Sequence, residues 1–338
     1  MNPRERILKT LRFEPVDRLP FDLMEGILWP EIMSYFKNQH GLTTHDEVIA
    51  FLDPDIRWTT ITWQGPLETP RRVQPDSGIY SEPVAVGPLY EATRLEEVER
   101  FPWPRADDWE VPEVRMARER FPDYAIALLA WKPLFLTACD VFGMEGALTK
   151  MLTHPHVFEA AIARKHAINM DLFERAMQAA DGFCDIFWIG DDFSGQHSLL
   201  MNPKLWRKLI KPYLAEEVQL ARSHGMAVLY HSCGAVSAVL DDLFEIGVNG
   251  LGVFQTSAAG MDPQTIAARF GGRLAFYGGI DVQTLLSFGT PEQVEEQVKS
   301  NLRAFSGCGG YILANSHRID TIRGENLTAM FRAAREFH

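Results

Sequence analysis

The chain has 338 residues, of which 46% are hydrophobic and 23% charged, and its formal net charge is -12 at pH 7. Phosphate contacts require a surplus of lysine and arginine, so this acidic balance argues against a nucleic-acid-binding protein. No apolar run approaches the roughly 20 residues that cross a bilayer, and the first residues lack the apolar stretch of a secretion signal. We therefore expect a cytoplasmic globular enzyme with no membrane or nucleic-acid partner.

The four cysteines, Cys139, Cys184, Cys233 and Cys308, lie far apart in the sequence. They are too sparse to form a disulfide framework in a chain of this length. We expect reduced thiols, which are free to bind a metal ion.

The N-terminal half contains two predicted strands, at 18–24 and 124–131. Between them, residues 54–112 are rich in proline, glycine and alternating β-forming residues. We interpret this segment as an insertion of short strands and loops near the mouth of the fold. Such a segment either covers a binding site or is a solvent-exposed elaboration without function.

The C-terminal half alternates short apolar runs with amphipathic segments, which is typical of repeated βα units. The predicted strands are 184–190, 226–231, 247–254, 273–279 and 310–315, and the clearest predicted helices are 202–225 and 290–307. With the two earlier strands, seven of eight barrel strands are accounted for. The prediction is a single α/β domain over 1–338, a (β/α)8 TIM-type barrel. A doubly wound open sheet is the alternative, but its G-x-G-x-x-G fingerprint is missing.

The tetrapeptide at 231–234, HSCG, directly follows an apolar strand. Side chains alternate along a strand, so His231 and Cys233 can point the same way at its carboxyl end, where barrel enzymes place catalytic groups. Imidazole and thiolate both bind zinc, and a catalytic zinc usually takes three protein ligands. The pair indicates a metal site, although a buried His and Cys at a strand end are more often packed and inert.

The third metal ligand has two candidates. His317 lies just beyond the last predicted strand and is the first choice. Cys308 is the alternative, but it precedes that strand and would lie at the opposite face of the barrel.

Two adjacent carboxylates, Asp191 and Asp192, follow the strand at 184–190. Neighbouring side chains of a regular strand point to opposite faces, so both cannot face the mouth. We expect one to be a catalytic carboxylate and the other to cap the following helix. Both could instead accept hydrogen bonds from loop amides.

Four more polar residues are candidate catalytic or substrate-orienting groups: Glu25, Gln255, Asp281 and Asn315. The last three lie at carboxyl ends of predicted strands, where they either orient a substrate or satisfy backbone groups near the rim. Glu25 follows the first strand and is a candidate acid or fourth metal ligand.

Five segments together resemble the uroporphyrinogen decarboxylase superfamily, which includes zinc-dependent corrinoid methyltransferases. They are 4–21, 190–214, 231–251, 276–294 and 309–336. The resemblance spans nearly the whole chain and implies a (β/α)8 barrel with its site in the carboxyl-end cleft.

Two branches of this superfamily differ after the first strand. The decarboxylase has an arginine-containing stretch there, which holds the carboxylate arms of a porphyrinogen. The corresponding segment here, 19–36, contains no arginine and presents Asp22 and Glu25 instead. Losing several charge-assisted hydrogen bonds of roughly 1.5–3 kcal/mol each disfavours porphyrinogen decarboxylation, which is kept as the runner-up function.

The methyltransferase branch has a His-x-Cys pair and a later cysteine as zinc ligands. His231 and Cys233 match the pair, and His317 stands where the later cysteine is expected. One thiolate fewer makes a bound metal a stronger Lewis acid. The resemblance therefore implies a zinc-dependent methyltransferase that demethylates a methyl ether or methylates a thiol, with the corrinoid on a separate carrier protein. A non-catalytic small-molecule-binding barrel is a further alternative, and oligomerisation stays open.

Overall fold

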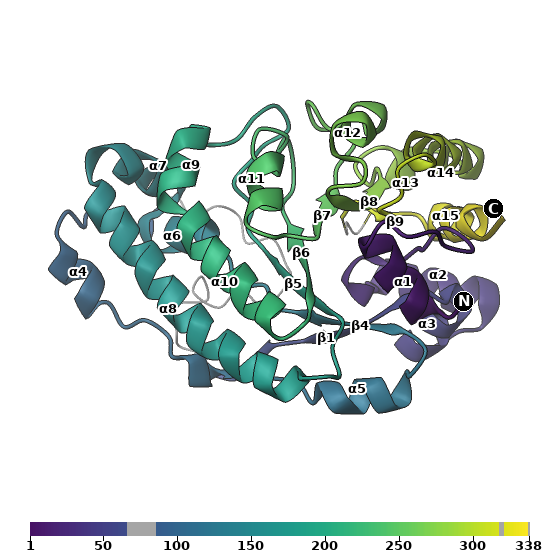
Figure 1. The fold of residues 1–338 in the computed structure, drawn as a ribbon, viewed down its shortest axis with the longest axis horizontal. Helices are drawn as coiled ribbons and strands as arrows, with labels where there is room; N and C mark the ends of the chain where they lie inside the picture. The colour runs from purple at the N-terminus through teal and green to yellow at the C-terminus, as the bar shows by residue number, and fades with distance from the viewer. Residues whose placement is uncertain (66–85, 318–320, 337–338) are drawn as a thin grey trace.

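The computed structural model describes residues 1–65, 86–317 and 321–336. Its main sheet contains seven parallel strands in the order β1-β4-β5-β6-β7-β8-β9, and it curls strongly, with helices along its outer side (Figure 1). The strands are β1 (Ile56–Thr60), β4 (Ala125–Leu129), β5 (Ile186–Gly190), β6 (Ala227–His231), β7 (Gly250–Phe254), β8 (Ala275–Ile280) and β9 (Tyr311–Asn315). The predicted α/β barrel is confirmed.

The helices between and around these strands follow in chain order. They are α1 (Pro3–Leu11), α2 (Pro30–His40), α3 (His45–Leu52), α4 (Leu95–Arg100), α5 (Val114–Arg120), α6 (Phe135–Phe142), α7 (Met144–Thr153), α8 (Pro155–Ala180), α9 (Pro203–Leu209), α10 (Lys211–Ser223), α11 (Leu240–Glu245), α12 (Pro263–Phe270), α13 (Leu285–Phe288), α14 (Pro291–Phe305) and α15 (Gly324–Glu336). None of the helices in the described ranges is long and apolar enough to cross a membrane.

Proline and capping residues explain where the two predicted helices begin and end. The segment 202–225 forms α9 and α10 rather than one helix, because Pro212 lacks the N–H that a continuous helix would need and instead fits the first turn of α10. In the segment 290–307, Thr290 and Gln293 form a capping box at the start of α14.

The ring of strands is closed by a very short segment, residues 20–22. Phe21 forms a parallel bridge with Leu313 of β9, whose N–H donates to the Pro20 carbonyl at 3.0 Å. On the other side, the N–H of Asp55 donates to the Phe21 carbonyl at 2.9 Å. The strand expected at 18–24 is therefore a single bridge in the eighth position, because Pro20 has no N–H to extend the ladder.

The segment expected to be an insertion, 54–112, begins with a strand of the main sheet. β1 pairs in parallel with β4, although its sequence IRWTT lacks the continuous apolar run typical of a buried parallel strand. After it, β2 (Thr62–Trp63) pairs antiparallel with β3 (Trp109–Glu110). Part of the intervening chain, 66–85, lies outside the described residues.

The inside of the barrel is filled by a separate cluster of buried side chains around Trp188 and Tyr277. The indole of Trp188 is fully buried, and it fits because β7 contributes no side chain at Gly252. A Cβ at Gly252 would lie 2.5 Å from the Trp188 ring. The interior is thus a packed core that supports the residues above it at the carboxyl ends of the strands.

Candidate metal centre

The candidate site lies at the carboxyl ends of β6, in the middle of the sheet order, and of β9, the last strand in that order. His231 is the last residue of β6 and pairs with Gly190 of β5 on one side and Gly252 of β7 on the other. Cys233 follows two residues later, and His317 follows the last residue of β9 by two positions. Residues that immediately follow parallel strands meet at one face of a barrel.

His231, Cys233 and His317 offer three donor atoms that all lie within 4.8 Å of one another. The Cys233 Sγ is 3.5 Å from Nε2 of His231, and the two imidazole centroids are 5.8 Å apart. A tetrahedral zinc with bonds of roughly 2.0–2.3 Å separates its donors by roughly 3.3–3.8 Å. The donor types and their separation fit zinc with a small closing movement of the widest pair.

Aromatic rings surround the imidazole of His231. Its centroid is 4.7 Å from that of Trp131 and 6.0 Å from that of Trp188, both in edge-to-face arrangements. The His231 side chain is only 3% exposed, and its Nδ1 is buried without a hydrogen-bond partner among the described residues. A buried ring nitrogen without a hydrogen bond costs free energy, so a hydrogen-bond acceptor close to Nδ1 would stabilise the imidazole.

Two carboxylates flank His231 on opposite sides. Glu25 Oε1 is 3.7 Å from Nδ1, and Asp192 Oδ1 is 3.7 Å from Nε2. Cys233 Sγ also lies near Nε2, so Nε2 is the nitrogen suited to a metal while Glu25 faces the other one. Glu25 has a positive φ of 54°, a conformation that is uncommon for a residue with a side chain and is found more often at functional sites.

The Asp191 carboxylate is buried and is hydrogen-bonded to backbone N–H groups. It accepts hydrogen bonds from the N–H groups of Phe135 at 2.5 Å and Leu136 at 3.0 Å, at the start of α6. Burial raises the pKa of Asp191 to about 7, although these two hydrogen bonds act in the opposite direction. Asp191 thus caps α6, which follows β4, rather than the helix that follows Asp191 in the chain. Of the two adjacent aspartates, Asp192 is the one beside His231.

The other polar residues predicted for the site bind the backbone near it. Gln255 Oε1 accepts from the N–H of Gly234 at 2.9 Å. Asn315 accepts from the N–H of Met24 at 3.1 Å and donates to the carbonyl of His317 at 2.7 Å. Both residues therefore hold backbone next to the candidate ligands.

Asp281 caps α13. Its carboxylate accepts from the Thr284 N–H at 2.8 Å and hydroxyl at 2.6 Å, and from the Leu285 N–H at 3.1 Å. Burial opposes its ionisation, but the hydrogen bonds outweigh this effect and the pKa of Asp281 is lowered. The structure gives Asp281 a capping contact rather than a contact with the three donors.

Cys308, the alternative third ligand, lies just before β9 and so at the amino end of the strands. Its Sγ is 3.6 Å from the Phe305 carbonyl, and it is not part of the three-residue group that includes His231. Burial raises the pKa of the Cys308 thiol, which disfavours a thiolate ligand there. None of the four cysteines forms a disulfide bond.

Sequence reasoning missed several residues that shape the site. Trp131 packs on His231, and Ser194 donates a hydrogen bond to the Cys233 carbonyl. Asp22, predicted from the sequence to be presented to a substrate together with Glu25, is instead fully buried and accepts from Trp58 Nε1 at 3.0 Å and from the Tyr277 hydroxyl at 2.7 Å. Desolvation raises the pKa of Asp22 well above its ordinary value. Only the position of Trp131 just after β4 offered a signal.

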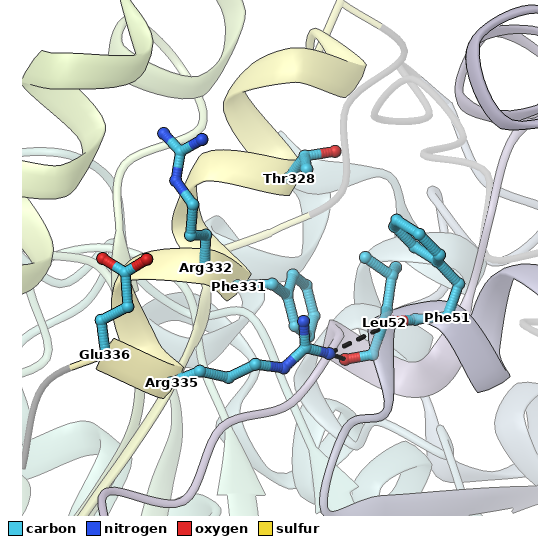
Figure 2. Close-up of a pocket in the computed structure, with 7 residues that line it drawn as sticks. All are labelled: Phe51, Leu52, Thr328, Phe331, Arg332, Arg335 and Glu336. Atoms are coloured by element: carbon cyan, nitrogen blue, oxygen red, sulfur yellow. Dashed lines mark hydrogen bonds between the residues drawn. The ribbon is translucent and has the colours of Figure 1, made fainter.

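A separate groove lies between the end of α3 and α15, as Figure 2 shows. Arg335 crosses it and donates to the carbonyls of Phe51 at 3.2 Å and Leu52 at 2.5 Å. Leu52 ends the helix before β1, so this groove lies toward the amino ends of the strands. It is therefore distinct from the candidate metal centre.

The fold and the three donors define an α/β barrel with a candidate metal centre at the carboxyl ends of its strands. The family model for uroporphyrinogen decarboxylase (URO-D) matches residues 113–337, which is well over half of the chain. The chain therefore belongs to the uroporphyrinogen decarboxylase (URO-D) family. No curated protein sequence matches it.

One solved structure has the same fold as this chain. A methyltransferase from Methanosarcina mazei superposes with a TM-score of 0.66 and 17% identity, and 99% of each chain is covered. D-psicose 3-epimerase from Clostridium cellulolyticum H10 gives a TM-score of 0.39 and 11% identity, with 93% of each chain covered. The first superposition shows that the two proteins share a fold, and the second is too weak to add to that conclusion.

Proposed function

We propose that the chain is a zinc-dependent methyltransferase that moves a methyl group between a small methyl donor or thiol acceptor and a corrinoid on a separate carrier protein. The observation that supports this most directly is the convergence of His231, Cys233 and His317 within 4.8 Å. Family membership and a methyltransferase of the same fold are consistent with it.

Some residues of this chain would bind the metal ion, and others would orient the ligand His231. Nε2 of His231, the Cys233 thiolate and an imidazole nitrogen of His317 would hold the ion, leaving a position for the substrate. When bound, zinc would lower the pKa of a thiol acceptor or polarise the oxygen of a methyl ether. Trp131 and Trp188 pack against the His231 ring and shield it from water, and Glu25, 3.7 Å from Nδ1, would accept a hydrogen bond from that nitrogen.

Glu25 is proposed as an orienting carboxylate rather than as a fourth ligand. It lies on the Nδ1 side of His231, whereas the Cys233 sulfur lies on the Nε2 side. A histidine that binds a metal through one nitrogen commonly donates its other N–H to a carboxylate, which fixes the ring orientation.

The runner-up is decarboxylation of a porphyrinogen, which the family name favours. Against it, the segment 19–36 has no arginine to bind the substrate carboxylates. Asp22 in that segment is already hydrogen-bonded to Trp58 and Tyr277. We expect no turnover of uroporphyrinogen by the purified protein, and measurable turnover would overturn the methyltransferase proposal.

Metal analysis of the purified protein tests the proposed site. We expect one zinc per chain, lost in Cys233→Ser and retained in the matched control Cys308→Ser. Methyl transfer from methyl ethers to a reduced corrinoid, and from a methylated corrinoid to thiols, would then identify the direction of the reaction. Metal-free protein with full thermal stability would favour a small-molecule-binding barrel or a metal-independent enzyme instead.

A further inference from the structure

The backbone turn that presents Cys233, residues 233–235 and here called the Cys233 turn, is hydrogen-bonded to the loop after β5. Asp192 Oδ1 accepts from the Cys233 N–H at 2.8 Å, and the Ser194 hydroxyl donates to the Cys233 carbonyl. The N–H of Ala235 donates to the carbonyl of Gly195, in the same loop, at 2.9 Å. The backbone N–H and carbonyl of Cys233 are therefore both hydrogen-bonded to this loop, through Asp192 and Ser194.

The other side of the Cys233 turn is bound by Gln255, which follows β7. Its Oε1 accepts from the Gly234 N–H at 2.9 Å, and the residue is 7% exposed. β7 lies next to β6 in the sheet, as β5 does on the opposite side. The turn is thus fixed from both neighbouring strands.

An irregularity in β7 directs Gln255 toward this contact. The register between β7 and β8 shifts between Gly252 and Phe254, and Val253 has a φ of 65°. A β-branched residue rarely adopts this left-handed conformation, so the surrounding structure must enforce it. A bulge changes which way the following side chains point, and here it precedes the residue that binds Gly234.

The Cys233 turn approaches the β5 loop so closely that only glycine fits at position 234. Gly234 has a φ of 86°, and a Cβ there would lie 2.5 Å from the Gly195 carbonyl oxygen and 2.6 Å from Ser194 Oγ. A side chain would therefore separate the two loops and break the hydrogen bond from Ser194.

We propose that Gln255 is a positioning residue that, together with Ser194, holds the Cys233 turn in the conformation in which its thiol faces His231 before any metal binds. Ser194 and Gln255 bind the carbonyl and the N–H of the single peptide group that joins Cys233 to Gly234, and Asp192 binds the N–H of the preceding peptide group. Together these contacts fix the direction of the Cys233 side chain from both sides. Zinc affinity then depends on Gln255, although its side chain touches no donor atom. The identity of the metal as zinc rests on the proposed function, whereas the fixed orientation of the Cys233 thiol does not depend on it.

The test compares Gln255→Ala with Gln255→Glu, which keeps an acceptor oxygen for the Gly234 N–H. Zinc affinity is measured by chelator competition, and the thiolate-to-metal absorption band is recorded after substitution with Co²⁺. We expect Gln255→Ala to bind zinc about tenfold more weakly and to alter the band, as loss of a group that orients a ligand commonly does. Gln255→Glu should recover most of the affinity. Gln64→Ala, at an exposed glutamine bound to Glu110, is the matched control.

A metal-free measurement separates this proposal from the proposed function. The rate at which iodoacetamide alkylates Cys233, followed by peptide mass spectrometry at fixed pH, should change several-fold in Gln255→Ala and in Ser194→Ala. Because both residues act on the same turn, the double variant should change less than the product of the single effects. Unchanged alkylation in Gln255→Ala overturns the inference, whereas a wild-type chain that binds no zinc overturns only the proposed metal.

Discussion

The two faces of the barrel use charged residues differently. At the amino ends of the strands, Asp55 lies immediately before β1 and is bound by Arg6 at 2.6 Å, by two hydrogen bonds from Arg18 at 2.8 Å, and by the Phe21 N–H at 3.0 Å. At the carboxyl ends, His231 keeps a buried nitrogen without a hydrogen-bond partner in the described part of the chain. Fully paired groups of this kind stabilise a fold, whereas Nδ1 of His231 has the Glu25 carboxylate 3.7 Å away and Nε2 faces Cys233.

Asp185 repeats the arrangement of Asp55 at the amino end of β5. It accepts from Arg118 at 2.5 Å, from Arg4 at 2.9 Å and from the Ile126 N–H at 2.9 Å. The same side-chain type at the other face, Asp192, binds the Cys233 N–H and approaches the imidazole. The comparison predicts that substitutions at the amino face change stability, while those at the carboxyl face mainly change metal binding.

The largest expected effect is at the amino face. Asp55→Ala should lower the free energy of unfolding by about 3–5 kcal/mol, because it deprives the half-buried Arg18 guanidinium of the Asp55 carboxylate and leaves the buried Arg6 guanidinium with Asp17 as its carboxylate partner. Urea-induced unfolding measures the loss. In the control Asp107→Ala, an exposed carboxylate that pairs with Arg105 and Arg175 is removed, and the cost should stay below about 1 kcal/mol. Equal midpoints for the two variants would contradict the division between the faces.

A smaller loss, accompanied by a change in the site, is expected for Gly190→Ala. The added Cβ would lie 2.5 Å from the Cβ of His231 and 2.8 Å from the Trp131 ring. We expect a cost of about 1–3 kcal/mol and weaker zinc binding, because the imidazole must move. Gly307→Ala is the control, since no heavy atom lies within 4 Å of its added Cβ. If Gly190→Ala has the thermal stability and zinc affinity of the wild type, the added methyl group does not displace the His231 imidazole.

Glu25→Gln should change metal binding with little change in stability. Loss of the carboxylate beside Nδ1 is expected to weaken zinc binding about tenfold, equivalent to about 1.4 kcal/mol, while the metal-free protein unfolds at the wild-type temperature. Chelator competition and thermal denaturation give the two values. Glu31→Gln, at an exposed residue of α2, should alter neither. Unchanged zinc affinity in Glu25→Gln would remove Glu25 from the site.

The smallest effect concerns Asp281, a carboxyl-face residue whose contacts are those of a helix cap. Asp281→Ala should cost about 1 kcal/mol near neutral pH. Since the pKa of Asp281 is lowered in the folded protein, its contribution is complete above the ordinary carboxyl pKa of about 4 and is lost as the pH falls through the folded value. Unfolding measured at about pH 7 and about pH 3 should therefore show the difference shrinking in acid. A constant difference would mean that the charge of Asp281 does not matter.

The convergence of His231, Cys233 and His317 could be predicted from sequence because it depends on two regular features. Side chains alternate along β6, and residues that follow parallel strands meet at one face of a barrel. Seven strand positions were recognisable for the same reason. β1 was not, because only its first two residues are fully buried and its sequence resembles an exposed segment.

The contacts of Gln255 and Asp191 could not be predicted from sequence. The direction of Gln255 depends on the bulge at Val253, which no local pattern in GVNGLGVF specifies. Asp191 caps α6, a helix from an earlier unit, because β4 and β5 are neighbours in space. Both contacts form between different βα units of the barrel, whereas a sequence pattern mainly indicates the structure of the βα unit in which the pattern occurs.

The contacts of Asn315 have a consequence for the order in which the molecule becomes complete. Its amide joins the Met24 N–H, from the first turn of the chain after the ring closure, to the carbonyl of His317 near the C-terminus. A ribosome-bound chain that lacks its last strand holds His231 and Cys233 but not the third donor. Capture of an ion by all three groups would accordingly report that synthesis has passed residue 317.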